Sequence, residues 1–87
     1  MSTTLSRIQT LLSFLLKAIQ ENDELQYDEV SEWMEEIEEL HTEYILQLGY
    51  YWEKLNRELY IAKGNMEDVK SEILEMLYQV DEMIDNM

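Results

Sequence analysis

The fold is decided by residues 28–62, which read DEVSEWMEEIEELHTEYILQLGYYWEKLNRELYIA. The segment contains no Pro, and apolar residues such as Val30, Ile37 and Tyr44 recur in it at helical spacing. The same face continues without a change of phase through Tyr51, Trp52, Leu55, Leu59 and Ala62. Because a turn normally shifts the phase of such a pattern, we predict one long helix with room for a bend at Gly49. Its length would be about 35 residues, or roughly 52 Å.

Two shorter helices are predicted on either side of this segment. A helix over residues 4–21 follows from a stripe spaced by three and four, formed by Leu5, Ile8, Leu12, Leu15 and Ile19. A helix over residues 66–85 follows from the same spacing in Met66, Val69, Ile73, Met76, Val80, Met83 and Met87. Gly64 and Asn65 suit the end of one helix and the cap of the next.

The composition favours a single all-α domain over residues 1–87, because the chain has two Gly, no Pro and 46% hydrophobic residues. We predict a three-helix antiparallel bundle with a long central helix. The apolar arc of the first helix spans about 200°, which one neighbour cannot cover, so a homodimer is expected to complete the bundle. The expected core or dimer contacts are Leu11, Phe14, Leu15, Trp33, Tyr51 and Trp52. The alternative is a monomeric four-helix bundle broken at Gly49.

The distribution of charge is the strongest functional signal. The net charge is −14, and residues 21–43 hold eleven acids without a single Lys or Arg. Like charges four positions apart on a helix each cost about 0.2–0.5 kcal/mol, so this arrangement lowers the stability of an ordered helix. The acids of residues 28–43 lie opposite the apolar stripe at one charge per ~3 Å, close to the ~3.4 Å between phosphates along one DNA strand.

We therefore predict a small acidic binding or inhibitor protein that presents carboxylates in place of phosphates, in the style of acidic helical inhibitors encoded by phages. Its partner would be a basic protein, such as a nucleic-acid-binding protein or a nuclease complex. The predicted partner-binding residues are Asp23, Glu24, Asp28, Glu29, Glu32, Glu35, Glu36, Glu39 and Glu43. The alternative is a structural adaptor dimer whose acids only keep it in solution. Direct binding to nucleic acid or to a membrane is disfavoured by the charge.

A smaller exposed stripe is predicted on the other side of the central helix. Tyr50 and Ile61 fall opposite the apolar stripe, with Arg57 between them. Aromatic residues in such a position can anchor a binding interface.

The sequence offers no enzymatic motif. It has no Cys, no Gly-rich phosphate loop and one histidine, His41, which falls on the apolar face and is expected to be a hydrogen-bonded core residue. We therefore predict no catalytic residue, no metal and no cofactor. The apolar run before Lys17 is interrupted by Ser13 and is too short to span a membrane, so a cytoplasmic location is expected.

One carboxylate pattern points to a third alternative. Residues 35–39 give E-E-x-x-E, and residues 72–75 give E-x-x-E, spacings at which carboxylates on neighbouring helices hold Mg²⁺. The pattern resembles that of the all-α MazG-type nucleotide pyrophosphohydrolases, which pair an E-E-x-x-E helix with an E-x-x-D helix. The resemblance implies Mg²⁺-dependent hydrolysis of nucleoside triphosphates. This chain departs from the family at Glu75, where Asp is expected, and places Glu35, Glu36 and Glu39 opposite the apolar stripe.

Overall fold

The computed structural model describes residues 3–21, 27–61 and 66–86. The elements are α1 (Thr3–Glu21), α2 (Tyr27–His41), a 3-10 turn η1 (Thr42–Tyr44), α3 (Ile45–Asn56), a π-helical extension η2 (Arg57–Ile61) and α4 (Met66–Asp85). Because these ranges contain no strand, the predicted all-α bundle is confirmed. The predicted connections at residues 22–26 and at Gly64 and Asn65 lie outside the described residues.

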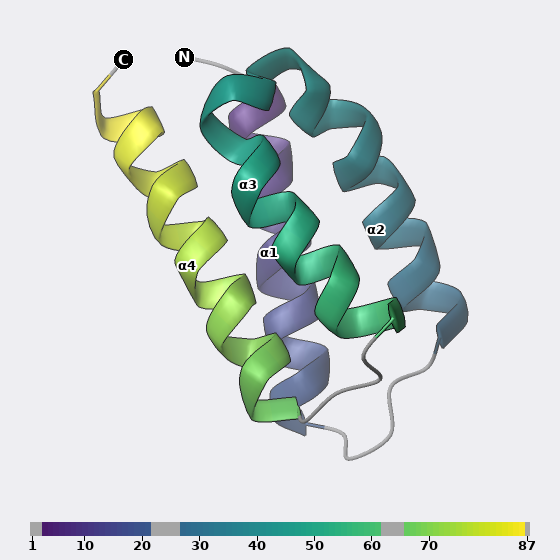
Figure 1. Cartoon of the computed structure of the whole chain (residues 1–87). Helices are drawn as coiled ribbons and strands as arrows, with labels where there is room; N and C mark the ends of the chain where they lie inside the picture. Colours follow the sequence, from purple (N-terminus) through teal and green to yellow (C-terminus); the bar gives the residue numbers. More distant parts are fainter. Residues whose placement is uncertain (1–2, 22–26, 62–65, 87) are drawn as a thin grey trace.

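The central helical segment is continuous, but it is not straight. Residues 27–61 are helical throughout, yet α2 and α3 run in opposite directions and lie side by side, with η1 between them (Figure 1). The segment therefore differs from the straight helix of about 52 Å predicted from the periodicity. The longest dimension of the molecule is 36 Å, which leaves no room for such a helix.

Side chains at the end of α2 bind its last carbonyl groups where the chain turns. The Nδ1–H of His41 donates to the carbonyl oxygen of Glu38 at 2.6 Å, and the hydroxyl of Thr42 donates to that of Glu39 at 2.8 Å. These bonds satisfy carbonyl groups that the next helical turn would otherwise use. Tyr44 then leaves the helical region, with φ −125° and ψ 38°. Gly49, the position at which we expected any break, lies inside α3.

The result is a four-helix bundle in which successive helices alternate in direction. α1 packs against α2 and α4, and α3 packs against the same two helices, so α1 and α3 lie across a diagonal (Figure 1). The start of α1, the end of α4 and the η1 turn lie at one end of the bundle (Figure 1). This is the architecture of the alternative four-helix prediction, with the turn at η1 rather than at Gly49.

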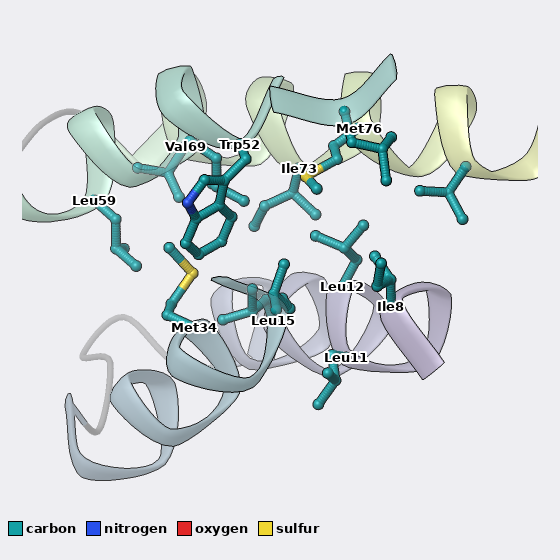
Figure 2. Close-up of a cluster of buried hydrophobic side chains, with 14 of the residues drawn as sticks. Ile8, Leu11, Leu12, Leu15, Met34, Trp52, Leu59, Val69, Ile73 and Met76 are labelled. Carbon is teal, nitrogen blue, oxygen red and sulfur yellow. The ribbon is translucent and has the colours of Figure 1, made fainter. Parts of the chain in front are cut away.

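All four helices contribute their apolar stripes to one core (Figure 2). His41, the only buried polar residue among those described, lies at its edge and is 6% exposed. The core residues from the four helices include Leu5, Ile8, Leu12, Val30, Met34, Ile37, Leu48, Leu55, Val69, Ile73, Met76 and Val80. Full burial of each such aliphatic side chain stabilises the fold by about 1.5–3 kcal/mol.

The core also changes the role of residues predicted to contact a second copy. Leu11 and Leu15 are at most 1% exposed and Trp52 is 6% exposed, so they lie in the core of one chain. Phe14 is 42% exposed and packs against Trp33, with ring centroids 5.7 Å apart. Tyr51 is partly buried. Apart from Phe14, the wide apolar arc of α1 is thus covered within one chain, so the width of this arc gives no reason for a dimer.

Candidate functional site

A row of carboxylates runs along the outer face of α2. Val30, Met34 and Ile37 are buried and fix the opposite face of this helix against the core. The exposed acids are Glu29, Glu32, Glu35, Glu38 and Glu39 on α2, together with Glu43 in η1. We name these six residues the α2 carboxylate strip.

The strip has no cation to neutralise it in the part of the chain that the structure describes. The ion pairs among these residues employ Arg7, Lys54 and Arg57, and every acidic partner in them lies outside the strip. Tyr27–His41 as a whole carries seven acids and no Lys or Arg. A surface of this kind produces a strongly negative potential, which attracts basic proteins and repels nucleic acid.

Glu36 is a predicted partner-binding residue, but, unlike the residues of the strip, it is paired with a cation. It lies at the edge of α2 that meets α1, where it pairs with the guanidinium of Arg7; one Nη donates to its carboxylate at 3.1 Å. The hydrogen bond from Arg7 lowers the pKa of Glu36, and the same bond raises the pKa of Arg7. Glu36 therefore links α1 to α2 instead of contributing a free charge.

Three other predicted partner-binding residues are not tested by the described part of the chain. Asp23 and Glu24 lie in residues 22–26, outside the described residues. Asp28 belongs to α2, but its side chain is also outside the description.

A shallow hollow of about 320 Å³ adjoins the strip between α2 and α3. Glu35 and Glu38 contribute carboxylates to its lining, and Met34 and Trp52 contribute apolar surface. Ser31 and Asn56 complete the lining. A hollow that combines apolar walls with carboxylates suits the long stem and charged head of a Lys or Arg side chain.

A second surface lies between α3 and α4, and the sequence revealed only part of it. The groove there has a volume of about 580 Å³ and is lined by Tyr50, Tyr51, Lys54, Leu74, Glu75 and Tyr78. Tyr50 and Tyr78 are each 67% exposed. We name this surface the α3–α4 groove. Of its residues, Tyr50 was expected to be exposed; the side chain of Ile61, predicted beside it, lies outside the described residues.

Leu74 and Tyr78 were missed in the sequence, although a signal was present. They are four positions apart on α4 and lie beside, not within, its buried stripe. An apolar pair of this kind on the outer face of a helix indicates an exposed patch.

Lys54 is the central charge of the α3–α4 groove. Its Nζ lies 3.3 Å from a carboxylate oxygen of Glu72 and 3.3 Å from one of Glu75, and 5.1 Å from the ring centroid of Tyr50. The hydrogen bond to Glu75, followed by the hydrogen bond and charge of Glu72, raises the pKa of Lys54.

The carboxylates of the nucleotide-hydrolase alternative lie on two helices that do not pack against each other. Glu35, Glu36 and Glu39 are on α2, whereas Glu72 and Glu75 are on α4, across the second diagonal of the bundle. Among the described residues, no group of three or more His, Cys, Asp or Glu side chains is placed to hold a metal ion.

No helix within the described ranges is long and apolar enough to cross a bilayer.

Comparisons with protein-family models, with curated proteins and with solved structures found no match. The function is therefore inferred from the geometry and charge of the chain itself.

Proposed function

We propose that the protein binds a basic, nucleic-acid-binding protein through the α2 carboxylate strip and blocks the site at which that protein holds nucleic acid. The observation that carries this proposal is the strip's exposure without a cationic partner among the described residues. The strip is part of a helix whose other face is buried, so the backbone that carries its carboxylates is ordered before a partner arrives. Such preorganisation lowers the entropic cost of binding.

The spacing of the strip supports imitation of phosphates. From Glu29 to Glu39, the five exposed carboxylates of the strip span about 15 Å of helix, or roughly one per 4 Å. Phosphates along one DNA strand are ~3.4 Å apart, so the linear charge densities are similar. A groove lined with Lys and Arg for phosphates would accept the strip, and the release of small ions from both surfaces would favour the complex.

The hollow between α2 and α3 adds a specific contact to this electrostatic attraction. A basic side chain of the partner would place its stem on Met34 and Trp52 and its charge beside Glu35 and Glu38. Charge alone steers association, whereas a side chain held in a pocket fixes the register of the two proteins.

Affinity capture with matched charge variants tests the proposal. The strip variant carries Glu32→Lys, Glu35→Lys and Glu39→Lys; the control carries Asp68→Lys, Glu82→Lys and Asp85→Lys on α4. All six positions are exposed, and each triple changes the net charge by the same amount. We expect the wild type and the control to capture the same basic protein at low salt and to lose it at high salt.

The strip variant should capture that protein at least about tenfold less well, because each removed contact is to a cation. Equal capture by the strip variant and the wild type would contradict the proposal. That outcome would instead favour the structural-adaptor alternative, in which the acids have no binding role.

A further inference from the structure

We infer that the hollow between α2 and α3 is an arginine-binding site, which takes the guanidinium side chain of an arginine from the basic partner in preference to a lysine. The inference rests on the proposed function for the nature of the partner, but the preference of the hollow for arginine can be measured without that protein. It assigns one side chain of defined shape and chemistry to one place beside the α2 carboxylate strip.

The hollow has the dimensions of a slot for one long side chain. Its volume is about 320 Å³. Along α2 it extends from Ser31 to Glu38, which is roughly 10 Å at the rise of an α-helix. On the other side α3 lines it with Trp52 and Asn56, which are one helical turn apart. A slot of this size accommodates one extended side chain, and the backbone of the partner would remain outside it.

Two carboxylates give the hollow its charge. Glu35 and Glu38 are three positions apart on α2 and both line the side of the hollow that this helix forms. Both are exposed, and the ion pairs among the described residues include neither of them. The other lining residues are uncharged, so the hollow selects a cation. By contrast, the α3–α4 groove already holds the ammonium group of Lys54.

The apolar part of the lining favours a weakly hydrated cation. Met34 is 2% exposed and Trp52 is 6% exposed, so both are anchored in the core and present a small, fixed surface to the hollow. The imidazole of His41 packs against the indole of Trp52 and helps to hold it in place. A cation that enters beside these side chains loses part of its water shell. This loss costs less for a guanidinium, which is more weakly hydrated than an ammonium.

The arrangement of hydrogen-bond acceptors also favours arginine. Glu35 and Glu38 line the hollow from α2, and the amide of Asn56 lines it from α3. A guanidinium has five N–H donors in one plane, so it can donate to acceptors on both helices while its face lies against the indole of Trp52. An ammonium has three donors on one atom and no planar face. The hollow therefore offers arginine a set of contacts that lysine cannot make at the same time.

Titration with single amino-acid derivatives tests the inference. The probes are N-acetyl-argininamide and N-acetyl-lysinamide, which carry one positive charge each. The readout is the fluorescence of Trp52 in a Trp33→Phe background, where Trp52 is the only indole; Trp33 contacts Phe14 of α1 and does not line the hollow. We expect saturable binding of the arginine probe with a dissociation constant in roughly the millimolar range, and at least about threefold weaker binding of the lysine probe.

Matched variants separate the hollow from the general charge of the strip. Glu35→Gln with Glu38→Gln removes two charges at the hollow, whereas the control, Glu29→Gln with Glu32→Gln, removes two at exposed strip positions that do not line it. The hollow variant should bind the arginine probe at least about fivefold more weakly, and the control less than about twofold. Circular dichroism of each variant checks that it is folded.

Equal affinity for the two probes, or equal weakening by the two pairs of substitutions, would overturn the inference, because either result would show attraction by net charge alone. A Trp52 signal that does not saturate with the arginine probe would overturn it as well. The proposed function is judged separately by capture of a basic protein. Failure of that capture would contradict the proposed function and leave a measured arginine preference intact, whereas capture without an arginine preference would contradict only the role of the hollow.

Discussion

The imidazole of His41 lies against the indole of Trp52, with ring centroids 5.4 Å apart and planes inclined by 34°. In a straight α-helix, residues separated by eleven positions would be about 16 Å apart along the axis. The contact therefore exists because the chain reverses at η1 and brings the end of α2 beside α3. It joins the two helices on which the strip and the α3–α4 groove depend.

A double-mutant cycle between these residues measures this contact. His41→Ala and Trp52→Phe should each destabilise the protein, and their effects should be non-additive by about 0.5–1.5 kcal/mol in urea unfolding. The control pair is His41→Ala and Val69→Ala. Val69 lies in the first turn of α4, at the end of the bundle opposite η1, so the two destabilising effects should add. Additive effects of His41→Ala and Trp52→Phe would show that the rings are not in contact.

The sequence predicts the helical segments and the core, but it conceals the turn for a specific reason. The buried residues on either side of η1 are His41 and Leu48, which are seven positions apart. Seven residues are close to two helical turns, so the reversal consumes one whole repeat and the apolar phase is the same before and after it. Thr42–Tyr44 also lacks Gly and Pro, the usual markers of a turn.

The candidate surfaces were predictable to different degrees. The exposure of Glu32, Glu35 and Glu39 follows from helical periodicity alone, because they lie opposite the buried stripe. The pairing of Glu36 with Arg7 does not follow from helical periodicity, because it joins residues 29 positions apart and depends on how α1 packs against α2. The α3–α4 groove likewise requires two neighbouring helices, which a single helical pattern does not identify.

Replacement of Gly49 by alanine distinguishes a turn at η1 from a turn at Gly49. Gly49 lies within α3, where a Cβ atom would be 3.3 Å from Cγ1 of Ile45. Ile45 is 56% exposed and can move aside, so Gly49→Ala should stabilise the protein by about 0.5–1 kcal/mol through the higher helix propensity of alanine. The measurement is the midpoint of urea unfolding. Marked destabilisation would indicate that Gly49 is a special turn position.

The Arg7–Glu36 pair should make stability depend on pH in the acidic range. The hydrogen bond from Arg7 holds the pKa of Glu36 below its ordinary value of 4.5, so the ionised carboxylate favours the folded state. This contribution is fully present above that value and is lost as the pH falls through the lower pKa of the folded protein. The difference in free energy of unfolding between the wild type and Arg7→Gln should therefore be constant near neutral pH and shrink in acid. A difference that grows in acid would contradict the pairing.

Removing charge from the strip should stabilise the fold. Glu35 and Glu39 are four positions apart on α2, and so are Glu32 and Glu36. The triple variant Glu32→Gln, Glu35→Gln and Glu39→Gln relieves this repulsion and should raise the free energy of unfolding at low salt by about 1 kcal/mol. The gain should decrease with added salt. Glu82→Gln on α4, which has no acid four positions away, should have a smaller effect. A destabilised triple variant would show that the strip has favourable partners within the chain.

Displacement of nucleic acid from the captured basic protein is the decisive test of the proposed function. Fluorescence anisotropy would follow a labelled nucleic acid bound to that protein as the acidic chain is added. The wild type and the α4 control triple should displace the nucleic acid, whereas Glu32→Lys, Glu35→Lys and Glu39→Lys together should raise the required concentration at least about tenfold. Displacement by this strip variant at the wild-type concentration would contradict the claim that the α2 carboxylates take the place of phosphates.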